Sequence, residues 1–241
     1  MSDPSTVYKT REWYEQYYQK QGGSYRNDLF RNPEVLFQTL ASDASVIAAL
    51  RSTSLEPTTA QILDVGCGGG GSIINFLRLG FDPCNIWGID ILPERIQIAR
   101  RRFPNINFIC GDASSMKEFF KDNRFNLVFE ATMFVQITDD HLAQRIADEM
   151  LRVVKTNGFI VLTDWRYGKP ANASYKALTK ERIAQLFHVG TRTELRGVHK
   201  GALVPPLGRF LSHRAALGYF LIQTLFSFLV GQVTTVLEKK M

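Results

Sequence analysis

A glycine-rich turn follows a short apolar run in residues 62–72, which read IleLeuAspValGlyCysGlyGlyGlyGlySer. The apolar run predicts a buried strand, and the turn predicts the start of a helix. Glycine allows positive φ angles and a close approach of the backbone to a ligand, and the first turn of a helix offers unpaired N–H groups. Gly66, Gly68 and Gly71 also satisfy the Gly-x-Gly-x-x-Gly pattern of dinucleotide-binding proteins. The segment therefore predicts a ligand site.

Three carboxylates fall at the ends of three successive predicted strands. Asp64 lies two residues before the first glycine, Asp90 ends the run 86–90, and Asp112 follows the run 106–110. Asp64 would repel a pyrophosphate but suits a ligand with an ammonium or sulfonium charge. Asp90 can accept from two ribose hydroxyls, and Asp112 is placed to accept from an adenine amino group. Because parallel strands end at one edge of a sheet, the acids predict a single site.

Short apolar runs alternate with amphipathic helical patterns through the middle of the chain. The runs after the glycine turn are residues 86–90, 106–110, 125–130 and 159–164. This alternation predicts parallel βαβ units and an α/β fold with a doubly wound sheet. Pro93 is expected to open one helix and Thr138 to be the N-cap of another.

The last third of the chain has a looser pattern. Residues 176–187 predict a helix, and residues 193–199 and 232–238 predict strands. No charged residue occurs from Ala215 to Leu237, which is long enough to cross a bilayer. The polar residues within it favour a buried helix over 215–229 instead. A spanning helix and a helix lying on a membrane surface are the alternatives.

The composition is that of an ordinary globular protein. The chain has 241 residues, of which 45% are hydrophobic and 22% charged, with a net charge of +6. Its three cysteines form no metal-binding pattern and indicate a reducing compartment. The N-terminus lacks the apolar core of a signal peptide, so a cytoplasmic protein is expected. The basic residues are dispersed, which favours solvated helix faces over a nucleic-acid groove.

Aromatic residues are concentrated near the N-terminus, within a helical region that extends over residues 8–56. They are Trp13, Tyr14, Tyr17, Tyr18 and Tyr25. Aromatic faces attract cations, so this segment is expected to close as a lid over a charged ligand. A helix that simply packs on the sheet is the alternative.

Taken together, the glycine turn and the three acids resemble the class I S-adenosylmethionine-dependent methyltransferases. The resemblance covers residues 60–240 and implies a Rossmann-like, mostly parallel seven-stranded sheet with helices on both faces. It also implies an antiparallel final pair of strands, with a helical insertion before the last one. The implied divisions of one domain are an N-terminal helical lid (1–58), a cofactor-binding core (59–200), an insertion (201–230) and a final strand and tail (231–241). The family's usual Pro-Gly before the fifth strand appears as Asn157-Gly158.

The resemblance implies S-adenosylmethionine as the cofactor. No metal is expected, because the sequence shows no carboxylate trio like the metal site of the family's catechol-type branch. The residues that it implies for cofactor binding are Asp64, Gly66, Cys67, Gly68, Gly70, Asp90, Ile91, Asp112, Ala113 and Glu130. The segment 130–134 would line the methyl-transfer zone.

A hydroxyl acceptor is a weak nucleophile and needs a general base. Candidates at the carboxyl edge of the sheet are Glu130, His141, Asp164 and His199. Of these we favour Asp164 or His141. Arg166, Tyr167 and Asn172 are expected to bind a polar acceptor, and Arg166 suits a phosphate or carboxylate.

A narrower resemblance concerns residues 164–172, 186–187 and 203–209. It points to methyltransferases that modify bacterial surface polysaccharides and glycans, and so to O-methylation of a sugar or other small molecule. Peripheral membrane contact through residues 207–230 is a further expectation. The alternatives are an RNA methyltransferase and an NAD(P)-dependent oxidoreductase, which shares the glycine turn.

Overall fold

The computed structural model describes residues 12, 15–16, 29–168 and 175–241. The five aromatic residues of the expected lid and Asn172 lie outside the described residues. Within the described ranges, no helix is both long enough and apolar enough to cross a membrane.

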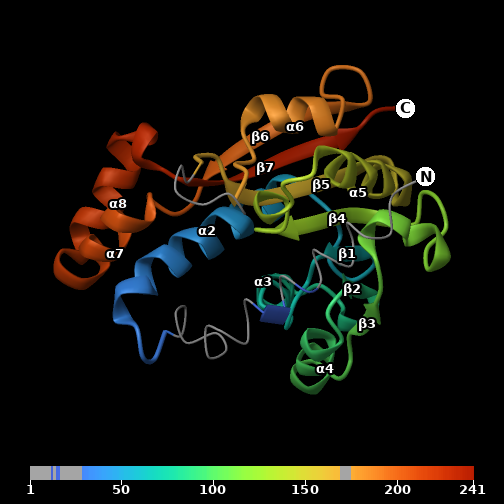
Figure 1. The fold of residues 1–241 in the computed structure, drawn as a ribbon, viewed down its shortest axis with the longest axis horizontal. Helices are drawn as coiled ribbons and strands as arrows, with labels where there is room; N and C mark the ends of the chain where they lie inside the picture. The colour runs from blue at the N-terminus through green and yellow to red at the C-terminus, as the bar shows by residue number, and fades with distance from the viewer. Residues whose placement is uncertain (1–11, 13–14, 17–28, 169–174) are drawn as a thin grey trace.

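A seven-stranded sheet organises the structure (Figure 1), in the order β3-β2-β1-β4-β5-β7-β6. The strands are β1 (Ile62–Val65), β2 (Ile86–Asp90), β3 (Asn107–Cys110), β4 (Phe125–Ala131), β5 (Val154–Trp165), β6 (Thr193–Lys200) and β7 (Gln232–Lys239). The first five strands are parallel, whereas β7 runs antiparallel to both β5 and β6. This is the Rossmann-like methyltransferase architecture expected from the sequence, and the prediction is confirmed.

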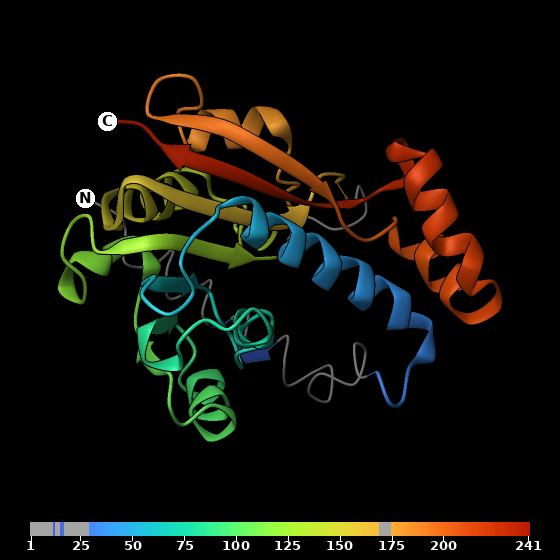
Figure 2. The same cartoon turned by 180° about the vertical axis from the view of Figure 1, so that it is seen from behind.

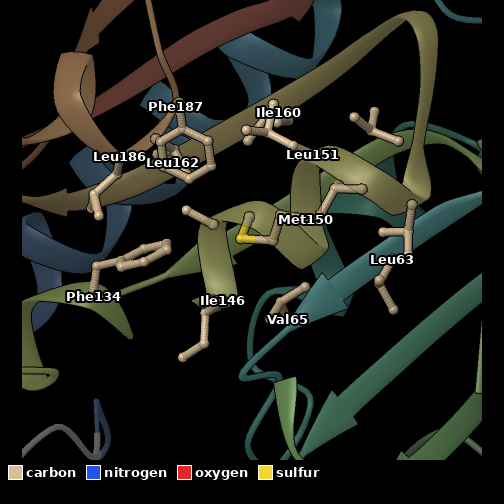
Figure 3. Packing of buried hydrophobic residues seen from close by; sticks show 14 of the residues in the cluster. Leu63, Val65, Phe134, Ile146, Met150, Leu151, Ile160, Leu162, Leu186 and Phe187 are labelled. Atoms are coloured by element: carbon tan, nitrogen blue, oxygen red, sulfur yellow. The ribbon is translucent and has the colours of Figure 1, made fainter. Parts of the chain in front are cut away.

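Helices cover both faces of the sheet (Figures 1 and 2). They are α2 (Leu36–Ser52), α3 (Ile73–Arg78), α4 (Pro93–Arg102), α5 (Asp140–Val153), α6 (Lys180–Leu186), α7 (Pro205–Arg214) and α8 (Ala216–Leu225). One apolar cluster joins α2, α3 and α4 to the sheet, and another joins α5 and α6 to its opposite face. Figure 3 shows the second cluster, where Ile146 and Met150 of α5 lie near Leu63 and Val65 of β1.

Helix α5 begins one residue later than the sequence suggested. Its N-cap is Asp139 rather than Thr138, because the Asp139 carboxylate accepts from the backbone N–H groups of His141 and Leu142. The predicted apolar stripe is buried, but the helix ends at Val153 and β5 starts directly after it. The strand predicted over 159–164 therefore starts earlier in the structure, at Val154.

The expected buried helix over 215–229 is wrong. The segment forms the shorter α8 and a 3-10 turn η6 (Ser227–Leu229). Only one side of α8 contacts the protein, where Tyr219 is fully buried and its hydroxyl accepts from the backbone N–H of Leu203 at 3.0 Å. Leu217 on the other side is 92% exposed. The absence of charge shows only that the segment is hydrophobic. It does not specify whether another part of the folded chain packs over it.

Helix α2, which falls within the region expected to form the lid, packs on the sheet. Its Ser45 hydroxyl lies 2.8 Å from that of Thr234 on β7, which lies 3.0 Å from that of Thr163 on β5. All three side chains are buried. This chain of hydroxyl groups connects α2 to the two central antiparallel strands.

Replacing Thr234 with valine tests this connection, because valine preserves the shape and removes the central hydroxyl. We expect Thr234→Val to lower the free energy of unfolding by about 1–2 kcal/mol, since a buried hydrogen bond is lost on both sides. Urea unfolding measures the effect. Thr235→Val on the same strand is the control, because its hydroxyl makes no hydrogen bond to the described residues, and equal losses in the two variants would contradict this account.

Candidate functional site

A cavity lies at the carboxyl ends of the parallel strands, where the sequence placed the ligand site. Six residues that the sequence singled out line it: Gly66, Gly68, Asp90, Ile91, Asp112 and Ala113. Thr132 and Met133, from the expected methyl-transfer segment after β4, complete this side of the wall. The topology thus brings the ends of β1 to β4 together around one space.

The turn needs glycine because its backbone adopts positive φ angles and because neighbouring side chains leave no room for a Cβ at Gly66 and Gly70. Gly66 has φ +70, and a Cβ added to it would lie 2.9 Å from the Sδ of Met133. Gly68 has φ +52, and its N–H donates to Oδ2 of Asp90 at 2.9 Å. Gly70 has φ +79, and an added Cβ would lie 2.9 Å from the ring of Phe103, the residue that follows helix α4. Gly70 and the buried Cys67 therefore support the turn from behind and do not line the cavity.

Asp90 is the polar centre of the cavity. Its Oδ1 accepts from the N–H of Leu92 at 2.9 Å, while Oδ2 accepts from Gly68. Burial raises the pKa of Asp90, although these two N–H groups and Arg95 oppose the rise. Each carboxylate oxygen has a second lone pair, so Asp90 can still accept hydrogen bonds from a ligand.

Two other carboxylates are buried at the ends of β1 and β4, behind the cavity wall. Asp64 is 1% exposed and Glu130 is fully buried. Oδ2 of Asp64 and Oε1 of Glu130 have no hydrogen-bond partner among the described residues. Burial is the main cause that raises the pKa of both groups well above the usual range, and a neighbouring acid adds to each, Asp90 for Asp64 and Asp164 for Glu130. Burying polar atoms without partners is costly, and neither acid is part of the cavity lining.

Asp112 and Ala113 also line the cavity. The Asp112 carboxylate caps the 3-10 turn η4 (Ala113–Glu118) by accepting from the N–H of Ser114 at 2.8 Å and from its hydroxyl at 2.9 Å. The same side chain lines the cavity. It is therefore fixed in place and keeps lone pairs for a ligand.

The turn after β4 is strained where it meets the cavity. Thr132 has φ 58, in the left-handed region that β-branched residues rarely adopt. Its N–H donates to the Thr163 carbonyl at 2.9 Å, and its own carbonyl accepts from the Gln136 side chain at 2.9 Å. Such strain persists only when surrounding contacts enforce it, and it gathers at functional sites.

Sequence reasoning missed part of the lining, namely Arg95, Gln136, Ile137, Leu142 and Ile146. Leu142 and Ile146 belong to the apolar stripe of α5, which helical periodicity identifies as core. Periodicity cannot distinguish a side chain that packs on the sheet from one that also borders a cavity. Arg95 was detectable in principle, because it lies in the first turn of the helix that follows Asp90.

Both expected general bases lie outside the lining. His141 is exposed at the start of α5. Asp164 is buried and accepts from the N–H groups of Trp165 at 2.7 Å and Val135 at 2.9 Å. Burial raises its pKa to about 7. His199 lies on the edge strand β6, where burial lowers its pKa. The geometry favours a structural role for Asp164, which holds the turn η5 (Phe134–Gln136).

The side chains of Arg166 and Tyr167 form hydrogen bonds with backbone carbonyls of this chain. The Arg166 guanidinium donates to the carbonyls of Val230, at 2.7 Å, and Ser227. The Tyr167 hydroxyl donates to the Phe228 carbonyl at 2.7 Å. These contacts attach the helical insertion to the end of β5, so the donors expected to bind an acceptor are engaged in the fold.

Comparison with known proteins identifies the core. Residues 62–158 match the family model of a methyltransferase domain. The 2-methyl-6-phytyl-1,4-hydroquinone methyltransferase of Synechocystis sp. is 31% identical over 140 residues, which cover 55% of this chain and 42% of that protein. The demethylmenaquinone methyltransferase of Renibacterium salmoninarum is 30% identical over 107 residues, covering 44% and 42% of the two chains.

Residues 62–158 are thus similar to a methyltransferase domain, and the fold is that of S-adenosylmethionine-dependent methyltransferases. Each of these two matches spans 42% of the relative's length. A TehB-like SAM-dependent methyltransferase from Corynebacterium glutamicum shares the fold over 99% of this chain and 100% of its own, with a TM-score of 0.55 and 16% identity.

The residues of the methyltransferase domain fit its cofactor. The unpartnered oxygens of Asp64 and Glu130 suit the ammonium group of the methionine part. Asp90 retains lone pairs for the ribose hydroxyls, and Gly66 and Gly68 bring the backbone to the edge of the cavity. In the part of the chain that the structure describes, no cluster of His, Cys, Asp or Glu is grouped as metal ligands would be.

Gly66→Ala should weaken binding of S-adenosylhomocysteine at least about tenfold, because the added methyl group displaces Met133 in the cavity wall. Calorimetric titration measures the affinity. Gly80→Ala is a matched control, since Gly80 has a similar φ of +81 but nothing within 4 Å of an added Cβ. Both variants should lose about 1 kcal/mol of stability from backbone strain, and equal affinities in the two would contradict the role of Gly66.

The raised pKa of Asp164 predicts a pH dependence of stability. A carboxyl whose pKa is higher when folded binds more protons in the folded state, so stability falls as pH rises from about 4 to about 7. Asp164→Asn removes this titration, and urea unfolding across that range should show a shallower fall than in the wild type. Asp64 and Glu130 should sustain the remaining slope. An unchanged slope would show that Asp164 is not buried as described.

Proposed function

We propose that this protein transfers a methyl group from S-adenosylmethionine to a hydroxyl group of a small-molecule acceptor. The observation that supports this most directly is the pair of buried, unpartnered carboxylate oxygens on Asp64 and Glu130 beside the glycine turn. A pyrophosphate there would face two acids at close range. A ligand with ammonium and sulfonium charges compensates them, which favours this cofactor over a nicotinamide dinucleotide.

The protein's own contribution is binding and alignment. When bound, the cofactor supplies an electrophilic methyl group on its sulfonium. Asp90 would hold the ribose, while Ile91, Ala113 and the apolar side chains of α5 would enclose the adenine. The strained turn at Thr132 and Met133 is where we place the acceptor, because it borders the cavity beside the ends of β1 and β4.

We propose a hydroquinone-type acceptor ahead of a sugar. Both reported relatives have hydroquinone or menaquinone precursors in their names. The cavity wall beside the strained turn is largely apolar, with Ala131, Met133 and Ile137. A phenolic hydroxyl, with a pKa near 10, loses its proton far more easily than a sugar hydroxyl, and neither Asp164 nor His141 lines the cavity to act as a base. The sugar acceptor remains a prediction from sequence alone.

The first experiment is calorimetric titration with S-adenosylhomocysteine, with NADH as the parallel ligand. Micromolar binding is expected for the first and none for NADH. Asp90→Ala should weaken binding at least about tenfold, since a carboxylate that accepts from ligand hydroxyls contributes about 1.5–3 kcal/mol. Asp82→Ala is the control, because Asp82 likewise caps a turn with its carboxylate but lies outside the cavity. Binding of NADH alone would make the chain an oxidoreductase.

The second experiment defines the acceptor. The protein is incubated with methyl-labelled cofactor and either a short-chain hydroquinone, a hexose glycoside or a structured RNA. We expect label in the hydroquinone product, attached to oxygen when its position is determined by NMR. Label on a ring carbon would correct the atom but not the acceptor, whereas label in the glycoside or RNA alone would overturn the proposed acceptor.

A further inference from the structure

The helical insertion presents an exposed apolar face at one end of the molecule. Leu217, Leu221 and Leu225 follow at four-residue intervals along α8 and therefore share one side. They are 92%, 60% and 63% exposed. Phe228 in η6 is 66% exposed and Phe210 on α7 is 62% exposed. These five residues are the hairpin face.

The hairpin face is held rigidly from behind. Tyr219 of α8 is fully buried against α2 and α7, and its hydroxyl bonds to the Leu203 backbone. Arg166 and Tyr167, just after β5, donate to the carbonyls of Ser227 and Phe228 in η6. The leucines thus remain exposed although the rest of their helix is anchored, which is unfavourable in water for a face with no function.

The segment that carries the hairpin face contributes charges of one sign. Residues 195–237 contain no aspartate or glutamate. Arg214 at the end of α7 is exposed, and so is Lys200, whose ammonium donates to the Thr224 carbonyl near the end of α8 at 2.9 Å. Glu34, from another part of the chain, lies 3.9 Å from Arg209 on α7 and offsets that cation. An apolar helical face flanked by cations matches a surface of apolar chains beneath anionic headgroups.

The hairpin face is attached at the end of the sheet where the cavity lies. Strand β7 begins at Gln232, which pairs with Trp165 at the carboxyl end of β5. The insertion therefore projects from the end at which the parallel strands finish, and Figures 1 and 2 show α7 and α8 beyond that end of the sheet.

We propose that the hairpin face docks on the surface of an anionic lipid bilayer. Helix α8 has 10 residues, too few to span a bilayer, so the helix lies in the interface with its leucines among the acyl chains. A second copy of the chain is a poorer occupant, because a two-fold interface would bring the Lys200 and Arg214 cations of both copies together. This docking does not depend on the identity of the acceptor.

Sedimentation of the full chain with vesicles tests the docking. The vesicles contain phosphatidylcholine alone or with about 30 mol% phosphatidylglycerol, which gives a negative surface potential. The protein should sediment with the anionic vesicles and much less with the neutral ones, and raised salt should weaken the binding. Equal binding to both, or to neither, would overturn the proposal.

The variant Leu217→Ser/Leu221→Ser/Leu225→Ser should reduce the vesicle partition coefficient at least about tenfold, since three apolar side chains no longer leave water. Ile74→Ser is the matched control, because Ile74 is 44% exposed on the distant helix α3. Both variants should keep the wild-type circular dichroism spectrum and the wild-type affinity for S-adenosylhomocysteine. These readouts separate this test from that of the proposed function. Undiminished vesicle binding by the triple variant would overturn the proposal. A dimeric wild type that binds no vesicles, and that the triple variant converts to a monomer, would also overturn the proposal.

Discussion

Parallel strands that all end at one edge of the sheet impose the central electrostatic constraint on this structure. Asp64, Glu130 and Asp164 lie near the carboxyl ends of the adjacent strands β1, β4 and β5, and all three are buried. Burial raises the pKa of each. Such a group of acids is stable only if hydrogen-bond donors or positive charges reach it. Much of the surrounding architecture meets that requirement.

The acids are satisfied in different ways. Asp164 accepts from two backbone N–H groups, and thereby fixes the turn η5 beside the cavity. The guanidinium of Arg182, almost wholly buried on α6, donates to the carbonyls of Phe134 and Ile137 at the two ends of that region, and its charge favours ionised Asp164. Asp64 and Glu130 each keep one oxygen unpartnered among the described residues. The ammonium group of the proposed cofactor would supply donors to these two oxygens.

The insertion follows from the same topology. Because β7 is antiparallel, the chain must return to the carboxyl end of β5 before the last strand can pair there. The helices α7 and α8 occupy that return, and Arg166 and Tyr167 hold them in place. An exposed apolar face, a cationic border and the ligand cavity consequently belong to one end of the molecule. The proposed methyl transfer and the proposed bilayer docking would therefore take place on the same side.

The sequence by itself determined the local chemistry and the architecture. Short apolar runs and helical patterns indicate the strands and helices, and the glycine turn with Asp64, Asp90 and Asp112 predicts a site, because these signals depend on neighbours in the chain. Only the tertiary structure decided which candidates reach the cavity. It placed Leu142 and Ile146 in the wall, bound Arg166 and Tyr167 to distant carbonyls, and left Leu217 exposed. Each outcome depends on contacts between residues far apart in sequence, which hydrophobicity and spacing do not record.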